Sequence, residues 1–229
     1  LDAGIYQLAS LGDTVFIDNN GNGIQNLGEP GIANVKVNLL YSNGSPVLDS
    51  NNLPLTTTTN ANGFYEFINL LPGDYKVQFE LPSNYYFTSQ DAGTNDTKDS
   101  DPDVVTGVTN TVTLVSGQYN STVDAGIYEL GSIGDYVWLD EPNRNGIQDS
   151  SENGIEGVTV NLLLNGIIAA TTVTDSNGYY LFPNLIPGAY TVEFILPGGG
   201  YVFSPQTNLD DNENSGASNG SDVNISTGI

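Results

Sequence analysis

The sequence has no cysteine, no histidine and no methionine, and only four of its 229 residues are Lys or Arg. Without thiolate or imidazole groups, the chain lacks the ligands with which proteins bind zinc, copper or iron–sulfur clusters. It also cannot form disulfides, so its cysteine content does not indicate a redox compartment. Any metal that it binds is expected to be one that prefers oxygen ligands, such as calcium.

Positive charge is scarce as well, since 27 Asp and Glu face four Lys and Arg and give a formal net charge of −23. Nucleic acid requires a basic surface, so we expect no nucleic-acid partner. Long apolar runs are missing, which predicts no membrane insertion in this segment. Negative charge of this size destabilises a compact fold through self-repulsion unless cations offset it. A divalent cation is therefore the first candidate partner.

The dominant feature that is present is an internal repeat. GDTVFIDNNGNGIQNLGEPGIANVKVNLL from Gly12 is matched by GDYVWLDEPNRNGIQDSSENGIEGVTVNLL from Gly134. Further on, NANGFYEFINLLPGDYKVQFELP from Asn60 is matched by DSNGYYLFPNLIPGAYTVEFILP from Asp175. Two copies of one module therefore account for most of the chain.

A third correspondence involves the first residues, because LDAGIYQLASLGD at the start matches VDAGIYELGSIGD at residues 123–135. The stretch that closes the first repeat is thus also present ahead of it. We predict three parts: residues 1–8, the closing strand of a preceding repeat or a donor strand; residues 9–130, the first repeat; and residues 131–229, the second repeat, which lacks its last strand.

Alternation of apolar and polar residues predicts β-strands throughout, and helical periodicity is absent. The predicted strands span residues 35–41, 63–68, 75–81 and 109–115 in the first repeat, and 158–164, 178–182 and 189–196 in the second. Pro-Gly and Asn-Gly pairs between them predict tight turns. The pattern indicates an all-β fold of two tandem β-sandwich modules with Greek-key connections. The aromatic pairs Phe64–Tyr65 and Tyr179–Tyr180 are each expected to place one ring in the core and one outside.

The stretch DNNGNGIQNLGE at residues 18–29 matches a twelve-residue calcium loop, D-x-[DN]-x-[DN]-G-x5-E. Such a loop uses side-chain oxygens at positions 1, 3 and 5, a glycine at 6, a backbone carbonyl at 7 and a carboxylate at 12. The predicted ligands are Asp18, Asn20, Asn22, Ile24, Asn26 and Glu29. The flanking segments are predicted strands, not the helices of an EF-hand, and a polar turn without metal is the alternative.

The second repeat keeps the same spacing with one inserted residue, which leaves Asp140 or Glu141 for the first position. The other predicted ligands in this repeat are Asn143, Asn145, Ile147, Asp149 and Glu152. Because the carboxylate spacing recurs, we favour Ca²⁺ as the cofactor over a polar turn.

A second acidic segment, QDAGTNDTKDSDPD at residues 90–103, has a weaker counterpart at residues 208–222. It can gather a further calcium ion or form a solvated loop, and both interpretations stay open here. The candidate ligands are Asp99, Asp101 and, at the position matching Asp101 in the second repeat, Asp222, with Asp13 or Asp135 approaching from a neighbouring strand.

Several motifs together resemble the calcium-binding B repeat (SdrD B-like type) of serine-aspartate-repeat surface adhesins, which is related to the B-type module of collagen adhesins. They are GDYVWLDEPNRNGIQDSSENGIEGVTVNLL, NGYYLFPNLIPGAYTVEF, TNDTKDSDPD and VDAGIY. The resemblance covers nearly the whole chain. It implies a transthyretin-like or immunoglobulin-like sandwich that coordinates several calcium ions, with sites at the two loops described above, and a rigid stalk on a bacterial cell surface.

These observations predict a calcium-stiffened spacer repeat of an extracellular bacterial surface protein or secreted filament that supports adhesion. Its expected partners are neighbouring repeats of the same protein, end to end. Catalysis is not expected, because no His, Cys or nucleophile-elbow motif supports hydrolytic chemistry.

Two alternatives remain at this point. In the first, a donor strand adds to a sheet edge of another copy and builds a homopolymer; an excerpt from a longer chain of repeats explains the same pattern. The candidate donor residues are Leu1, Asp2, Ala3, Gly4, Ile5 and Tyr6. In the second, exposed aromatic side chains bind carbohydrate or a host protein. The aromatic candidates are Tyr85, Tyr86, Phe87, Tyr201 and Phe203.

Overall fold

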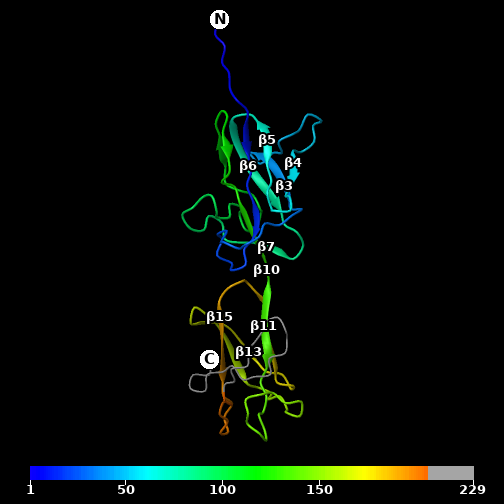
Figure 1. Cartoon of the computed structure of the whole chain (residues 1–229), viewed down its shortest axis with the longest axis vertical. Coiled ribbons are helices and arrows are strands. Elements are labelled where there is room, and N and C mark those ends of the chain that lie inside the picture. Colours follow the sequence, from blue (N-terminus) through cyan, green and yellow to red (C-terminus); the bar gives the residue numbers. More distant parts are fainter. Residues whose placement is uncertain (206–229) are drawn as a thin grey trace. The chain divides into compact units, whose positions relative to one another are not determined.

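The computed structural model describes residues 1–205, and the chain divides into two compact units, Leu1–Leu130 and Gly131–Ile229 (Figure 1). We call them module 1 and module 2. All regular elements of the described residues are β-strands. This part of the chain contains no helix of the length and hydrophobicity that a membrane crossing needs.

The strands of module 1 are short. They are β1 (Ala9–Leu11), β2 (Val15–Ile17), β3 (Lys36–Tyr41), β4 (Thr56–Thr58), β5 (Phe67–Leu70), β6 (Gly73–Glu80), β7 (Tyr85–Phe87), β8 (Val112–Leu114), β9 (Tyr119–Asn120) and β10 (Ala125–Glu129). One sheet is antiparallel with the order β4-β3-β6-β8. The remaining strands form the groups β5-β1-β9 and β2-β10-β7, in which β10 runs parallel to β2 and antiparallel to β7.

The core of module 1 draws apolar side chains from both sets of strands, which therefore pack as a sandwich. Strand β6 shows the underlying pattern, because Tyr75, Val77 and Phe79 are buried while their neighbours face outward. Just before β5, the ring of Tyr65 lies edge-on to that of Phe79, with centroids 5.4 Å apart. The Tyr65 hydroxyl donates a hydrogen bond of 2.7 Å to the Val123 carbonyl, so its polar end is satisfied inside the core.

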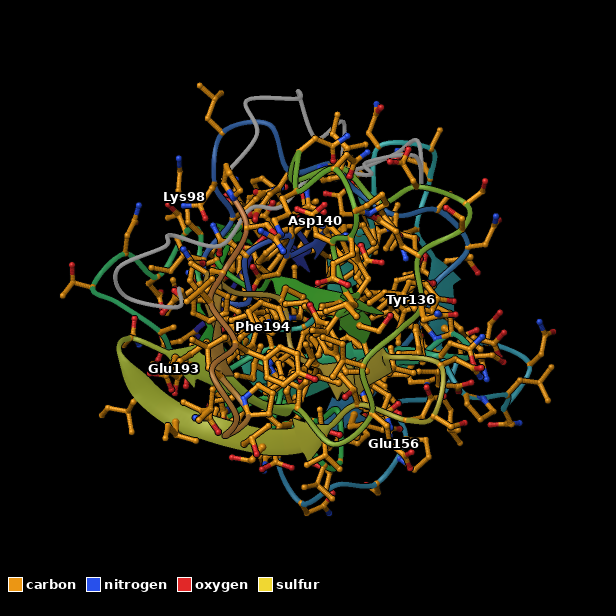
Figure 2. The ribbon with its side chains drawn as sticks, turned by 90° about the horizontal axis from the view of Figure 1, so that it is seen from below. Lys98, Tyr136, Asp140, Glu156, Glu193 and Phe194 are labelled. Atoms are coloured by element: carbon orange, nitrogen blue, oxygen red, sulfur yellow. The ribbon has the colours of Figure 1, made fainter. Side chains whose placement is uncertain are left out.

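Module 2 repeats this architecture with fewer described strands. They are β11 (Gly131–Tyr136), β12 (Thr159–Leu164), β13 (Ile167–Val173), β14 (Tyr179–Leu185) and β15 (Tyr190–Ile195). β12 lies between β13 and β15, and β11 pairs with β14. The core holds Val160, Leu162, Tyr180 and Phe182. The ring of Phe194, which Figure 2 labels, packs edge-on against Tyr180 with centroids 5.5 Å apart.

The predicted all-β sandwich fold is confirmed, and each predicted strand overlaps an observed one. The prediction at residues 63–68 starts too early, because β5 begins at Phe67 and Phe64 makes only an isolated bridge to Thr14. β13 was not predicted, since its side chains are exposed or half-buried and carry no clear alternation. Both aromatic pairs behave as expected: Tyr65 and Tyr180 are buried, whereas Phe64 and Tyr179 are not.

Candidate metal centre

Loop A, residues 18–29, leaves the end of β2 and returns beside it. The Ile17 N–H donates to the Pro30 carbonyl at 2.8 Å, which fixes the two ends of the loop together. Asp18, at the first position, is fully buried. One carboxylate oxygen accepts hydrogen bonds from the Gly21 and Asn22 N–H groups, and the other accepts from Gly23 N–H and from the Thr88 hydroxyl, the latter at 2.6 Å.

The other candidate side chains of loop A turn toward one another. Asn20 and Asn22 both donate through Nδ2 to Oδ1 of Asn26, at 2.7 and 2.9 Å. The Glu29 carboxylate folds back over the loop and accepts from the N–H groups of Asn19 and Asn26 at 3.0 and 2.7 Å. The side chains at positions 1, 3, 5, 9 and 12 are therefore gathered by the loop and not spread into solvent.

The glycine at the sixth position is required by the structure. Gly23 has a φ of 78°, a conformation that L side chains rarely adopt. A Cβ there would also lie 2.6 Å from Ala92 Cβ and 2.7 Å from the Ser89 carbonyl oxygen. The next residue, Ile24, is the seventh position of the loop. Its N–H donates a hydrogen bond of 2.8 Å to Asn22 Oδ1, which closes a tight turn around Gly23.

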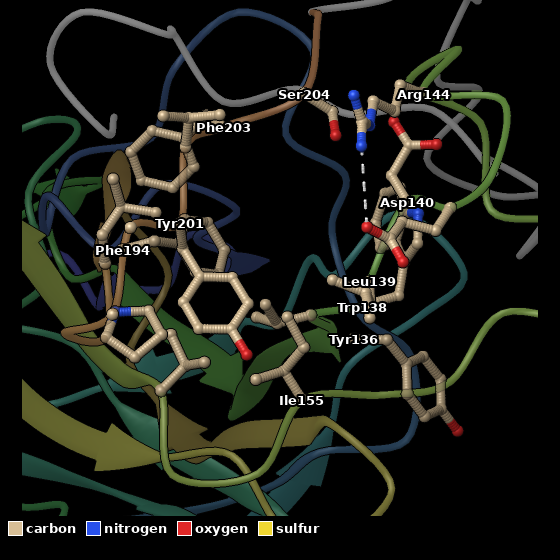
Figure 3. A pocket seen from close by; sticks show the side chains of 18 of the residues that line it. Tyr136, Trp138, Leu139, Asp140, Arg144, Ile155, Phe194, Tyr201, Phe203 and Ser204 are labelled. Carbon is tan, nitrogen blue, oxygen red and sulfur yellow. Dashed lines mark ion pairs between the residues drawn. The ribbon is translucent and has the colours of Figure 1, made fainter.

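Loop B, residues 140–152, has the same construction in module 2. Asp140 is buried and accepts from the N–H groups of Asn145 and Gly146 at 3.2 and 2.9 Å, as Asp18 does in loop A. In addition, Asn145 Oδ1 accepts from the Ile147 N–H, and Asn143 Nδ2 donates to Asp149 Oδ2 at 2.7 Å. Glu141 instead lies at the surface, 3.8 Å from the guanidinium of Arg144 (Figure 3). Asp140 thus takes the first position.

The last carboxylate of loop B also turns inward. Glu152 Oε2 accepts a hydrogen bond of 2.8 Å from the Asp149 N–H. Its Oε1 is buried and has no hydrogen-bond partner. A buried carboxylate oxygen without a partner is costly, and a bound cation removes that cost.

The acidic segment at residues 90–103 is attached to loop A by its backbone. The Gln25 N–H donates to the Lys98 carbonyl at 2.7 Å, and the Ser100 N–H donates to the Gly23 carbonyl at 3.0 Å. Asp99, which forms a bridge with Ile24, is buried and leaves Oδ1 without a partner. Burial raises the pKa of Asp99, and the nearby charges of Asp96 and Asp91 raise it further. Asp99 therefore belongs beside loop A.

Asp101 lies elsewhere, next to Asp124, a residue that sequence reasoning missed. Asp101 Oδ2 accepts a hydrogen bond of 2.7 Å from the Asp124 N–H. Burial is the main reason that the pKa of Asp101 rises to about 8 and that of Asp124 to about 9, with the charge of Asp13 adding to the effect on Asp124. Asp124 Oδ2 is buried without a partner. The sequence signal that could have identified Asp124 is that an aspartate precedes A-G-I-Y in both copies of that stretch, at residues 2 and 124.

In the predicted second cluster, Asp99 adjoins loop A and Asp101 contacts Asp124, while the charges of Asp13 and Asp99 both act on Asp124. Within residues 1–205, no three acidic side chains converge closely enough to form a metal site from carboxylates alone. A site in loop A or loop B would depend on amide and backbone oxygens as well. Asp135 pairs with Tyr180 across β11 and β14, and Asp222 lies outside the described residues.

The sequence of both modules matches the profile of the SdrD B-like domain, over residues 9–127 and 131–228. The chain belongs to the SdrD B-like domain family. This is a family of structural adhesin repeats and not of enzymes.

Two staphylococcal relatives match most of this chain within much longer proteins. Serine-aspartate repeat-containing protein F of Staphylococcus epidermidis (strain ATCC 12228 / FDA PCI 1200) is 44% identical over 203 residues, which cover 87% of this chain and 12% of that protein. Serine-aspartate repeat-containing protein D of Staphylococcus aureus (strain MW2) is 41% identical over 220 residues, which cover 94% of this chain and 15% of that protein. The chain thus spans a small part of the relatives that it matches.

Solved structures similar to these SdrD B-like modules include the Bacillus anthracis TIE protein, with a TM-score of 0.38 and 15% identity, covering 87% of this chain and 30% of that one. A streptococcal ancillary pilin has a TM-score of 0.37 and 15% identity, covering 87% and 57%.

Proposed function

We propose that the SdrD B-like modules are calcium-stiffened spacer units of an extracellular bacterial surface protein or filament that supports adhesion. One observation carries the proposal: each module builds the same loop, in which a buried aspartate is held by backbone N–H groups and a glutamate folds back from the far end. The arrangement is kept in both modules although loop B has one inserted residue, which favours a metal loop over a chance polar turn.

The charges of the described residues favour a cation in these places. Three carboxylate oxygens, on Asp99, Asp124 and Glu152, are buried without a hydrogen-bond partner. Protonation would relieve Asp101 and Asp124 at neutral pH, as their raised pKa values indicate. A bound calcium ion would stabilise the buried carboxylates without protonating them. It would also offset part of the net charge of −23.

The residues that would hold calcium in loop A are Asp18, Asn20, Asn22, Ile24, Asn26 and Glu29, with Asp99 adjoining. Those in loop B are Asp140, Asn143, Asn145, Ile147, Asp149 and Glu152. A bound ion supplies crosslinks between segments of a loop that otherwise rest on hydrogen bonds. Each site at a calcium concentration a hundredfold above its Kd would stabilise the fold by about 2.7 kcal/mol. Stiffening by such crosslinks is the mechanical role that we propose.

The names of the relatives support repeats within a larger serine-aspartate repeat-containing protein. This chain corresponds to only 12% and 15% of the length of those two proteins. We therefore propose, by similarity, that the protein to which the chain belongs supports adhesion and lies outside the cell. Millimolar extracellular calcium would fill even weak loops of this kind.

Direct ligand binding through aromatic side chains has less support. Phe87 is buried in the core of module 1, and Tyr86 stacks on Tyr128 with ring centroids 6.0 Å apart. Phe87 is therefore not available to a ligand, whereas Tyr86 is 47% exposed and already stacked on a neighbouring ring.

Thermal unfolding in calcium and in chelator tests the proposal. We expect calcium to raise the Tm of the chain by about 10 °C or more, because about 2 to 3 kcal/mol moves the Tm of a domain of this size by that amount. Magnesium should do far less, since it dehydrates reluctantly and demands a stricter geometry. A calcium shift of less than a few degrees would contradict the stiffening role.

Matched variants in loop B connect the effect to the site. Glu152→Gln should remove most of the calcium-dependent stabilisation of module 2, because its carboxylate faces into the loop. Glu141→Gln is the matched control, because it makes the same chemical change in the same loop, two residues from Asn143, but at the surface. It should leave the calcium response unchanged. Equal responses of the two variants would count against loop B as the site.

A further inference from the structure

Strand β13 forms one edge of the three-stranded sheet of module 2, because it pairs with β12 on one side (Figure 1) and with no other segment of residues 131–205. The corresponding strand of module 1, β4, is also an edge, and every residue of that module is described. There the sheet extends on its opposite side, past β6 to β8. An edge at the position of β13 is therefore a feature of the repeat itself.

Hydrogen bonding within module 2 fixes which backbone groups of β13 face this edge. Thr174 is bonded toward β12, because its N–H donates to the Val158 carbonyl and its carbonyl accepts from the Gly157 N–H, both at 3.0 Å. The ladder continues without a register shift through residues 170–173. In an antiparallel ladder, residues bonded to one neighbour alternate with residues whose N–H and C=O point the other way. The backbone groups of Thr171 and Val173 therefore point toward the open edge.

The side chains at this edge carry no charge. Residues 157–173, which form β12, its turn and β13, include neither a charged residue nor a proline. Val173 is 59% exposed, and Thr171 is exposed as well. The Thr171 hydroxyl donates to Asn161 Oδ1 at 2.8 Å, and Asn161 Nδ2 donates to Glu193 of β15 at 2.7 Å. Uncharged β-branched residues on an open edge favour the addition of another strand.

The matching edge of module 1 is interrupted. In module 2 a two-residue turn, Asn165–Gly166, joins β12 directly to β13. Module 1 has a longer connection between β3 and β4, which contains Asp49 and Pro54. This connection forms a small hairpin of its own, with the Asp49 N–H donating to the Leu53 carbonyl at 2.8 Å. Prolines, charges and irregular backbone protect an edge from pairing, so the two modules differ in their protection.

We propose that β13 of module 2 pairs antiparallel with β13 of a second copy of this chain, across a two-fold axis at Thr172. In this register Thr171 of each copy lies opposite Val173 of the other, so the outward N–H and C=O groups of both residues find partners. The two Thr172 residues form the non-hydrogen-bonded pair on the axis. A second copy fits because the outward groups of this strand are complementary to themselves under two-fold symmetry.

The positions of the acidic groups permit this contact despite the net charge of −23. The three described strands of the sheet contain one charged residue, Glu193 on β15, which Figure 2 labels. The two copies of Glu193 would stand five strand spacings, or about 24 Å, apart, which exceeds the Debye length of about 8 Å at physiological ionic strength. Asp175, just after β13, is held in its own turn, where Oδ1 accepts from the N–H groups of Asn177 and Tyr179.

Disulfide trapping in the full chain tests the register, because the chain has no cysteine of its own. In the Thr172→Cys chain the two new side chains meet on the axis, where a Cα separation of about 4.5 Å suits a disulfide. Thr57→Cys is the matched control, since Thr57 is the half-buried counterpart of Thr172 in β4. With oxidised glutathione, we expect Thr172→Cys to form covalent dimers at least tenfold faster. Equal rates for the two chains would overturn the proposal.

Substitutions at Val173 in the Thr172→Cys chain test the backbone pairing. Val173→Pro removes an N–H that points to the partner and that module 2 does not use in its own ladder, so it should slow trapping at least tenfold. Val173→Glu keeps that N–H but places a charge at the edge, and it should also slow trapping, so the test does not depend on a tolerated proline. Val173→Thr keeps the N–H and the branched side chain and should trap like the parent.

Trapping of Val173→Pro and Val173→Glu at the rate of Val173→Thr would refute the strand pairing. Circular dichroism of each variant, compared with that of the parent, shows that the sheet itself is kept. Because these changes leave loops A and B intact, failure of the pairing would not bear on the calcium proposal.

Discussion

The stretch D-A-G-I-Y occurs twice, at residues 2–6 and 124–128, and its two copies have opposite fates. In the second copy, Ala125 and Ile127 are 0% and 1% exposed within β10, whereas Ile5 in the first copy is 96% exposed. The five residues are identical, so local sequence cannot explain the difference. What differs is the neighbourhood, because within the described residues β2 and β7 pair with the second copy and no strand pairs with the first.

The strands that flank β10 in module 1 can be compared with their counterparts in module 2. In module 1, β2 and β7 are regular strands on either side of β10. In module 2, their counterparts at residues 137–139 and 201–203 lie outside the regular strands, and only Trp138 keeps an isolated bridge, to Gly154. In module 1, β10 supplies hydrogen-bond partners and apolar cover to both edges that it joins.

The largest expected effect comes from placing one substitution in each copy of D-A-G-I-Y. Ile127→Asp should lower the free energy of unfolding of module 1 by at least ~4 kcal/mol, because it removes a buried apolar side chain and buries a charge in its place. Ile5→Asp, at the identical position of the exposed copy, should change it by no more than ~0.5 kcal/mol. Urea unfolding measures both. Equal effects would mean that the two copies are not in different environments.

The next effect concerns pH and distinguishes module 1, whose closing strand follows Asp124. Without metal, Asp101 and Asp124 have pKa values of about 8 and about 9 in the folded protein, against an ordinary value of 3.8. Between these limits the folded state holds more protons than the unfolded state, so stability falls as pH rises. For one such carboxyl, a rise of two pH units within this range lowers the free energy of unfolding by about 3 kcal/mol.

Thermal melts of the metal-free chain between pH 5 and pH 8 check this expectation. The Tm of module 1 should fall as pH rises, and calcium should reduce the fall because the ion replaces the protons. Asp124→Asn, which mimics a neutral carboxyl, should flatten the metal-free dependence. A Tm that stays constant or rises over this range without calcium would contradict the assignment of these protons.

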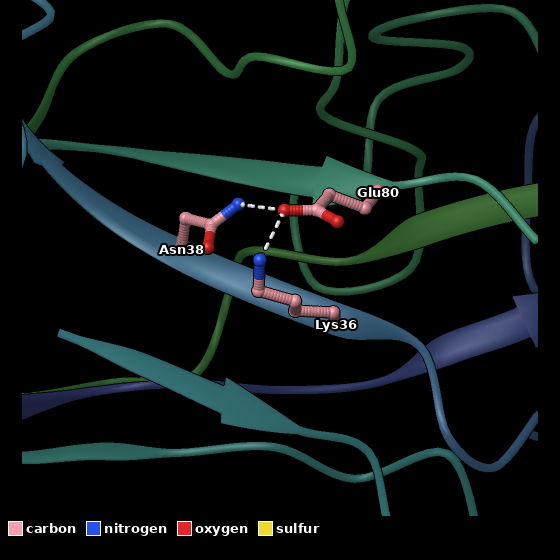
Figure 4. A network of polar contacts seen from close by, with 3 residues as sticks. All are labelled: Lys36, Asn38 and Glu80. Atoms are coloured by element: carbon pink, nitrogen blue, oxygen red, sulfur yellow. Dashed lines mark hydrogen bonds and ion pairs between the residues drawn. The ribbon is translucent and has the colours of Figure 1, made fainter. Parts of the chain in front are cut away.

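The smallest effect compares equivalent cross-strand pairs. In module 1, Lys36 of β3 lies opposite Glu80 of β6, with Nζ 2.7 Å from the carboxylate, which also accepts from Asn38 (Figure 4). In module 2, the matching pair is Thr159 and Ile195, without charge. Since the two charged side chains are half-exposed, Lys36→Met should cost no more than ~1 kcal/mol. A free energy of unfolding, measured in urea, that falls by several kcal/mol would show that this pair matters more than its exposure suggests.

Much of the local structure could be read from the sequence alone. Period-two alternation determined strands such as β6, because one face of each is buried and the other is not. The tight loop around Gly23 and its copy around Gly146 were also predictable, since the glycine, the asparagines and the final glutamate act within one short segment. Interactions between near neighbours depend on spacing, and spacing is visible in the sequence.

Only the tertiary structure decided which distant groups meet. It placed Asp99 beside loop A and joined Asp101 to Asp124 and Asp13, although all of them belong to acidic or repeated stretches that look alike in the sequence. It also decided that Asp140 and not Glu141 faces into loop B, and that one D-A-G-I-Y is buried while the other is exposed. Burial and desolvation depend on what the rest of the chain packs against a residue, and that information is absent from the residue's own neighbours in sequence.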